Sequence, residues 1–121
     1  MADKKESKEC YFCDFDGTMA KYSGWKGPLF FGEPVPDFVK MMKEWLKSGI
    51  EVVVFTARIS EDNPNLKLQI IMGLHAWCER HVGQVLEVTN IKSPRATRFY
   101  DDRNVCIEKN TGKIIGKCNV E

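Results

Sequence analysis

The sequence contains no long hydrophobic run. No stretch approaches the ~20 consecutive apolar residues that a membrane-spanning helix requires. The first nine residues, MADKKESKE, are charged and polar, and no apolar stretch resembling a signal peptide follows them. We therefore expect a cytoplasmic protein with no membrane partner, in which residues 1–8 form a short flexible tail.

An excess of one charge is also absent. The chain has 18 Lys and Arg residues against 17 Asp and Glu residues, which gives a formal net charge of +1. No global field therefore marks nucleic acid or a membrane surface as a partner, although a local basic patch is compatible with so small a net charge. With 121 residues, 43% of them hydrophobic and 29% charged, the composition is that of an ordinary globular domain.

The sequence lacks the paired cysteine motifs of a zinc site. Cys10 and Cys13 form one CxxC motif, and there is no second one. In a β-strand, residues three apart point to opposite faces, so these two sulfur atoms are expected to diverge. An odd number of cysteines, five, in no regular framework favours reduced thiols.

Linkers, repeats and low-complexity segments are absent, so we expect a single domain over residues 1–121. Glycine and proline concentrate in residues 17–36, which also contain four aromatic residues. This density excludes a long helix or a central strand and predicts an irregular flap or lid loop. Its aromatic side chains either pack locally or contact a ligand, and the sequence leaves both interpretations open.

The other segments predict an α/β fold with a mainly parallel sheet, because strand and helix patterns alternate along the chain. Apolar and β-branched runs predict strands, spacings of three and four predict helices, and two apolar runs around Asn110 and Gly112 predict a hairpin. The expected strands are 10–14, 50–56, 84–90 and 96–102, the helices are 36–49 and 65–83, and the hairpin is 105–115.

Polar residues follow all four predicted strands of the sheet. In open α/β sheets, ligands bind at the carboxyl ends of the strands, so these side chains are expected to converge. The residues are Asp14 and Asp16 after the first strand, Thr56 after the second, Lys92 after the third, and Asp101 and Asp102 after the fourth. His75 and His81 lie on a helix remote from these strand ends, which favours packing or surface roles.

A group of carboxylates at close quarters needs a cation, and hard oxygen ligands suit Mg²⁺. Such a site fits phosphoryl transfer. Asp14 is placed to attack phosphorus and form an aspartyl-phosphate. Asp16, kept protonated by its neighbour's charge, would donate a proton to the leaving oxygen and later accept one from water. The metal and Lys92 would stabilise the charge on the phosphoryl oxygens.

Four segments resemble the signature motifs of the haloacid dehalogenase superfamily. They are DFDGT (Asp14 to Thr18), VVVFTAR (Val52 to Arg58), Lys92 in NIKSP, and FYDDRNV (Phe99 to Val105). Their order and spacing match along nearly the whole chain. The resemblance implies a Rossmann-like three-layer sandwich, Mg²⁺, and chiefly phosphatase activity through an aspartyl-phosphate.

The resemblance also implies roles for residues of these motifs. Asp14 is the nucleophile and Asp16 the general acid and base, while Thr56 hydrogen-bonds the phosphoryl group and Lys92 bridges nucleophile and phosphate. The metal ligands would be Asp14, the backbone carbonyl of Asp16, and Asp102, with Asp101 in support. Substrate contacts are expected from Gly17, Thr18, Ala57, Arg58 and Arg103, although Arg58 and Arg103 are equally suited to pairing with acids.

No segment is long enough for a large cap domain, so the chain resembles the minimal, capless members, whose sites are open. The expected function is Mg²⁺-dependent hydrolysis of a phosphomonoester, on a nucleotide or a nucleic-acid terminal phosphate. A sugar phosphate is a nearly equal alternative. A regulatory module that binds metal and phosphate without turnover is another. A homodimer that covers the open site is a reasonable expectation.

Overall fold

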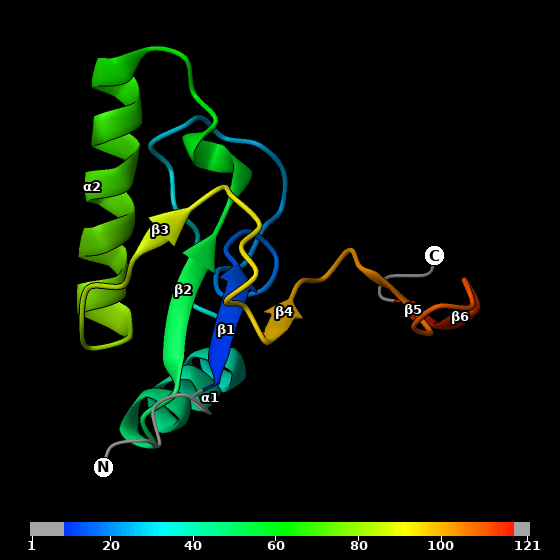
Figure 1. Cartoon of the computed structure of the whole chain (residues 1–121). Helices are drawn as coiled ribbons and strands as arrows, with labels where there is room; N and C mark the ends of the chain where they lie inside the picture. The colour runs from blue at the N-terminus through cyan, green and yellow to red at the C-terminus, as the bar shows by residue number, and fades with distance from the viewer. Residues whose placement is uncertain (1–8, 118–121) are drawn as a thin grey trace.

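The computed structural model describes residues 9–117 of the chain. Its centre is a four-stranded parallel sheet in the order β3-β2-β1-β4 (Figure 1). The strands are β1 (Cys10–Asp14), β2 (Glu51–Phe55), β3 (Val88–Thr89) and β4 (Arg98–Tyr100). The predicted parallel sheet is therefore confirmed, with β3 and β4 shorter than expected. The expectations for residues 1–8 and for Cys118 lie outside the described residues.

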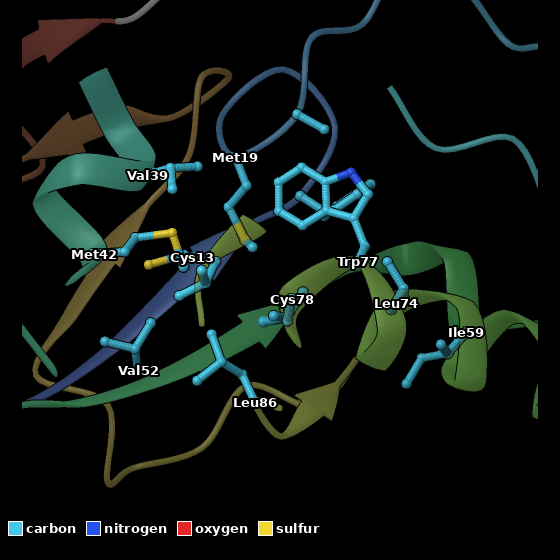
Figure 2. Close-up of a cluster of buried hydrophobic side chains, with 14 of the residues drawn as sticks. Cys13, Met19, Val39, Met42, Val52, Ile59, Leu74, Trp77, Cys78 and Leu86 are labelled. Atoms are coloured by element: carbon cyan, nitrogen blue, oxygen red, sulfur yellow. The ribbon is translucent and has the colours of Figure 1, made fainter. Parts of the chain in front are cut away.

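Both long helices pack against the same face of this sheet. They are α1 (Pro36–Lys47) and α2 (Pro64–His81), close to the predicted ranges. Asn63 begins α2 by accepting hydrogen bonds at its side-chain oxygen from the backbone N–H groups of Asn65 and Leu66. Figure 2 shows side chains from the sheet and both helices, among them Cys13, Met42 and Leu74, in one buried cluster.

The opposite face of the sheet carries a smaller apolar cluster, to which no helix of residues 9–117 contributes. Cys10, Phe12 and Val53 are buried there, packed against Phe55, Ala96 and Phe99. The covering segment is the connection from β3 to β4, residues 90–97, which crosses from one edge of the sheet to the other. In this part of the chain the structure thus has two layers, and the expected three-layer sandwich is wrong.

The missing layer has a local cause. Most parallel crossovers of this kind use a dozen or more residues and a helix, whereas residues 90–97 are too few to form one that packs well. The Arg95 side chain covers part of this face of the sheet. Its guanidinium lies 5.6 Å from the centre of the Phe12 ring and donates to Glu51 (2.6 Å) and Glu87 (2.7 Å).

Residues 17–36 are irregular up to the start of α1, as expected. The ends of this loop meet, because the backbone N–H of Lys21 donates to the carbonyl of Glu33 (2.8 Å). The indole of Trp77 on α2 fixes the same region by donating to the Gly32 carbonyl (2.8 Å). The two ends of the loop are therefore joined to each other and to α2. We call residues 22–32 the lid loop.

The chain ends in the predicted hairpin, β5 (Val105–Ile107) and β6 (Ile114–Lys117), which forms a separate antiparallel pair. Asn110 and Gly112 have positive φ angles, 69° and 78°, as the turn requires. The hairpin stands away from the sheet (Figure 1). None of the helices in residues 9–117 has the length and apolarity needed to cross a membrane.

Candidate metal and phosphate site

Strand register places the first and last acids side by side. Strands β1 and β4 are neighbours, and Cys13 pairs with Tyr100, so Asp14 and Asp101 follow at the same level. Carboxylate oxygens of Asp14, Asp101 and Asp102 all lie within 4.8 Å of one another. The predicted convergence of acids from distant parts of the chain is confirmed for these three residues. We call them the acid cluster.

The acid cluster has the donor set that a hard divalent cation prefers. Each of its residues offers a carboxylate oxygen and is partly exposed, which leaves room for water or a ligand to complete a coordination shell. The hydroxyl of Thr18 lies 3.5 Å from both Asp14 Oδ2 and Asp102 Oδ1, so it is able to donate weakly to either one.

Gly17 makes the close approach of Asp102 possible. Its φ angle is +90°, and a Cβ atom at this position would lie 2.6 Å from Asp102 Oδ2. A side chain here would strain the backbone and push the carboxylate away. The glycine of the DFDGT motif therefore shapes the acid cluster, whereas the sequence predicted a substrate contact for it.

The surroundings of Asp14 disfavour its charged form. The pKa of Asp14 is raised from 3.8 to about 7, chiefly because burial penalises the carboxylate and next because Asp101 repels it. A hydrogen bond with Asp102 and the charge of Asp102 raise it further, and Asp16 contributes least. A cation among the three carboxylates would remove this repulsion, so the residues fit a bound metal.

Asp16 lies outside the acid cluster and pairs with Arg58. Arg58 Nε donates to Asp16 Oδ2 (2.8 Å) and Nη2 donates to Oδ1 (3.0 Å). The Arg58 side chain is 5% exposed and the Asp16 side chain is 22% exposed, so the pair is largely buried. Both oxygens of Asp16 accept N–H groups, which is the geometry of a carboxylate and not of the protonated acid that the sequence led us to expect.

Arg58 also holds the lid loop. Its Nη1 donates to the Pro28 carbonyl (3.0 Å) and its Nη2 to the Phe30 carbonyl (2.8 Å). The guanidinium lies 5.0 Å from the ring centre of Trp25 and 4.9 Å from that of Phe31. One buried side chain thus connects Asp16, after β1, with the loop that follows it. Of the two roles open from the sequence, pairing with an acid is the one observed for Arg58.

One pocket of about 770 Å³ is lined by Asp14, Asp16, Thr56 and Ala57, together with Arg58, Arg103 and the other two members of the acid cluster, Asp101 and Asp102. Thr56 is 5% exposed, and its hydroxyl accepts from the Arg58 backbone N–H (3.1 Å), which starts the short 3-10 helix η2 (Ala57–Ile59). Arg103 is exposed, and its backbone N–H donates to Asp101 Oδ1 (2.8 Å). These predicted site residues therefore share one cavity.

Gly17 and Thr18 lie beside the acid cluster but do not line this pocket. Lys92 is the third predicted site residue outside the pocket. Its side chain is exposed, its Nζ lies 5.2 Å from the ring centre of Phe99, and it is not among the residues that line the pocket. The strand order explains this position. Strand β3 is separated from β1 by β2, about 10 Å at the usual strand spacing, and the chain then turns onto the outer face of the sheet.

The pocket also contains residues that the sequence did not single out for it, Phe55, Ser60, Glu61 and Asn104, and two aromatic residues whose role the sequence left open, Tyr22 and Trp25. Asn104 directly follows the DDR segment, so its position near the acids was a usable signal. The lid aromatics gave no such signal, because the fold of an irregular loop cannot be deduced from periodicity.

The remaining expectations for reactive residues are simple to place. Cys10 and Cys13 belong to the two opposite apolar clusters, as expected for a strand. Burial raises the pKa of the Cys13 thiol to about 12, which makes it a poor nucleophile or metal ligand. His81 packs against Trp77, with ring centres 4.8 Å apart and the ring planes tilted by 59°, away from the acid cluster.

Comparison with known proteins identifies a structural relative but no family. No family model matches the chain, and no curated protein matches it significantly. The chain is similar to a solved structure described as a conserved protein from Bacteroides thetaiotaomicron, with 26% sequence identity and a TM-score of 0.56. The match covers 82% of this chain and 79% of that one.

Proposed function

We propose that this protein is a Mg²⁺-dependent phosphomonoester hydrolase of the haloacid dehalogenase type. One observation carries the proposal: three carboxylates from β1 and β4 meet within 4.8 Å in a pocket at the carboxyl ends of parallel strands. A buried apolar strand gains nothing from ending in repelling acids unless a cation joins them. The resemblance of the four motifs to that superfamily supports the same reaction class.

In this proposal Asp14 attacks phosphorus, and Asp14, Asp101 and Asp102 would hold the metal. When bound, Mg²⁺ would neutralise the carboxylates and polarise the phosphoryl oxygens. The attack forms the Asp14–phosphorus bond and releases the alcohol oxygen of the substrate. Water then cleaves the aspartyl-phosphate and regenerates the carboxylate with inorganic phosphate.

Asp16 moves the protons in both steps, and Arg58 sets its position. As an ionised pair with Arg58, Asp16 is ready to accept a proton from the attacking water. Donation to the leaving oxygen requires a proton on Asp16, and hence that one of the two Arg58 hydrogen bonds gives way when substrate binds. Thr56 remains the proposed hydroxyl donor to the phosphoryl group.

The cationic partner of the phosphate is Lys92 or Arg103. Lys92 reaches the pocket only if its side chain leaves the Phe99 ring, whereas Arg103 already lines the pocket. Comparing Lys92→Met with Arg103→Met assigns this role. Replacing the residue that contacts the phosphate should lower kcat/KM by about 100-fold, the usual scale for loss of one transition-state contact.

Hydrolysis of an aryl phosphate with and without Mg²⁺ tests the proposed function. We expect turnover that a chelator abolishes and that Asp14→Asn lowers by at least ~1,000-fold, as loss of a nucleophile does. Asp16→Asn is the matched variant, because its side chain lies outside the acid cluster and Mg²⁺ should still raise its Tm. Absence of turnover on a broad phosphate panel would instead favour a binding or regulatory module.

A further inference from the structure

We propose that Trp25 and Tyr22 form a stacking platform for the base of a nucleotide whose phosphate sits at the acid cluster. The proposal rests on the proposed function for the position of the phosphate, and it narrows the substrate to phosphomonoesters that carry a planar heteroaromatic ring. Neither residue belongs to the four motifs. Both lie in the lid region and line the same pocket as Asp14.

Trp25 is exposed although its surroundings hold it in place. Its side chain is 59% exposed, yet the Arg58 guanidinium lies 5.0 Å from its ring centre. Arg58 is in turn fixed by Asp16 and by the Pro28 and Phe30 carbonyls. The indole is therefore supported by a buried cation while much of its surface remains available, and an aromatic ring presented in this way binds a base at low entropic cost.

Tyr22 offers a second aromatic surface to the pocket. It is 50% exposed, and within residues 9–117 no hydrogen bond or ring contact involves it. Most other aromatic side chains of the protein pair with one another in the core, as Tyr11, Trp45 and Tyr100 do. Tyr22 and Trp25, like Phe30 of the same loop, have no aromatic partner in the described part of the chain, and they are the two of these three rings that line the acid pocket, where a stacking platform is required.

Size and polarity of the pocket agree with a nucleotide. Its volume of about 770 Å³ lies within the range of small-molecule sites. The acid cluster supplies the phosphate end, while Asn104, Ser60 and Glu61 supply donors and acceptors suited to the edges of a sugar or a base. A sugar phosphate alone would leave the aromatic surface unused.

Binding to the Asp14→Asn protein tests the platform without turnover. Trp25 fluorescence is the readout, since Trp77 is only 7% exposed and Trp45 packs against the core. With Mg²⁺ present, we expect adenosine monophosphate to quench emission and to bind at least ~10-fold more tightly than ribose 5-phosphate, the scale of one stacked base. Plain adenosine should quench as well, more weakly.

Variants of the ring assign the effect to stacking. Trp25→Ala should reduce nucleotide affinity, measured by calorimetry, to that of ribose 5-phosphate. Trp25→Phe keeps an aromatic ring and should retain most of the affinity, which would show that the loss in Trp25→Ala does not come from misfolding. Phe30→Ala is the matched control, because Phe30 is a 49% exposed aromatic of the same loop that does not line this pocket. It should leave nucleotide affinity unchanged.

The outcomes separate the two proposals. Equal affinities for adenosine monophosphate and ribose 5-phosphate, unchanged in Trp25→Ala, would overturn the platform and leave the phosphatase untouched. Quenching by adenosine in a protein that hydrolyses no phosphate would overturn the proposed function and support the platform. Both a free nucleotide and the end of a nucleic acid present a base beside a phosphate. A phosphorylated trinucleotide binding more than ~10-fold tighter than the mononucleotide indicates the nucleic-acid end, and equal binding indicates the free nucleotide.

Discussion

The two charged groups at the carboxyl end of the sheet are built in opposite ways. The Arg58–Asp16 pair joins opposite charges, is largely buried, and has guanidinium donors directed at both Asp16 oxygens and at two loop carbonyls. The acid cluster joins like charges and is partly exposed, and its described contacts include the Arg103 backbone N–H at Asp101 (2.8 Å) and the long contacts of Thr18. The first is a completed structural connection, whereas the second brings together repelling carboxylates that a bound cation would stabilise.

Removing the arginine should have the largest effect on stability. Arg58→Met leaves the Asp16 carboxylate and two carbonyls without their donors, and breaking such a buried pair costs about 3–5 kcal/mol. We expect a matching loss in the free energy of unfolding by urea, with increased protease cleavage of the lid loop. In Asp16→Asn, Arg58 still donates to the Pro28 and Phe30 carbonyls, so the loss in the free energy of unfolding should be smaller. Equal losses for the two variants would mean that Arg58 does not hold the lid.

Filling the position next to Asp102 should damage the acid cluster selectively. Gly17→Ala combines a strained backbone, costing about 1–2 kcal/mol, with displacement of the Asp102 carboxylate. We expect the rise in Tm on adding Mg²⁺ to be largely lost. Gly24→Ala is the control, since its φ is +116° but nothing lies within 4 Å of its added Cβ. Gly24→Ala should lose stability through the strained backbone and keep the rise in Tm on adding Mg²⁺.

The acid cluster should also make stability depend on pH. Asp14 has a pKa of about 7 in the folded protein and an ordinary value of 3.8, so between these values the folded state binds the proton that the unfolded state has released. Without metal, this group's contribution to stability therefore falls as pH rises from about 4 to 7. Solvent screening limits the effect to a few degrees in Tm.

Two comparisons check this pH dependence by thermal unfolding. Asp14→Asn should flatten the metal-free profile between pH 4 and 7. In the unaltered protein, saturating Mg²⁺ should stabilise more at pH 8 than at pH 5, because protons compete with the metal for the carboxylate. A Mg²⁺ response that is larger at pH 5 would contradict the assignment of Asp14 as a ligand.

The smallest effect is expected at Thr18. Its hydroxyl lies at 3.5 Å from two carboxylates, the outer limit of a hydrogen bond. Thr18→Val should change the free energy of unfolding by only about 0.5 kcal/mol. A loss of several kcal/mol would show that this hydroxyl, and not a cation, is the main partner of the acids.

Several features could be predicted from sequence because they depend on local patterns. The ranges of β1, α1, α2 and the hairpin followed from apolar spacing and turn residues. The meeting of Asp14 with Asp101 and Asp102 followed from one general rule, that parallel strands end at the same edge. The expectation failed for Lys92, since its strand lies two positions from β1 and the rule says nothing about strand order.

The sequence by itself determined a parallel α/β sheet with acids at its carboxyl end, because backbone propensity and side-chain periodicity are properties of short segments. Only the tertiary structure decided that Arg58 pairs with Asp16 and holds the lid loop, that both helices share one face, and that Trp25 and Tyr22 open into the acid pocket. These features depend on contacts between residues far apart in the chain. These contacts contribute to stability only after the sheet has formed and brought the residues together.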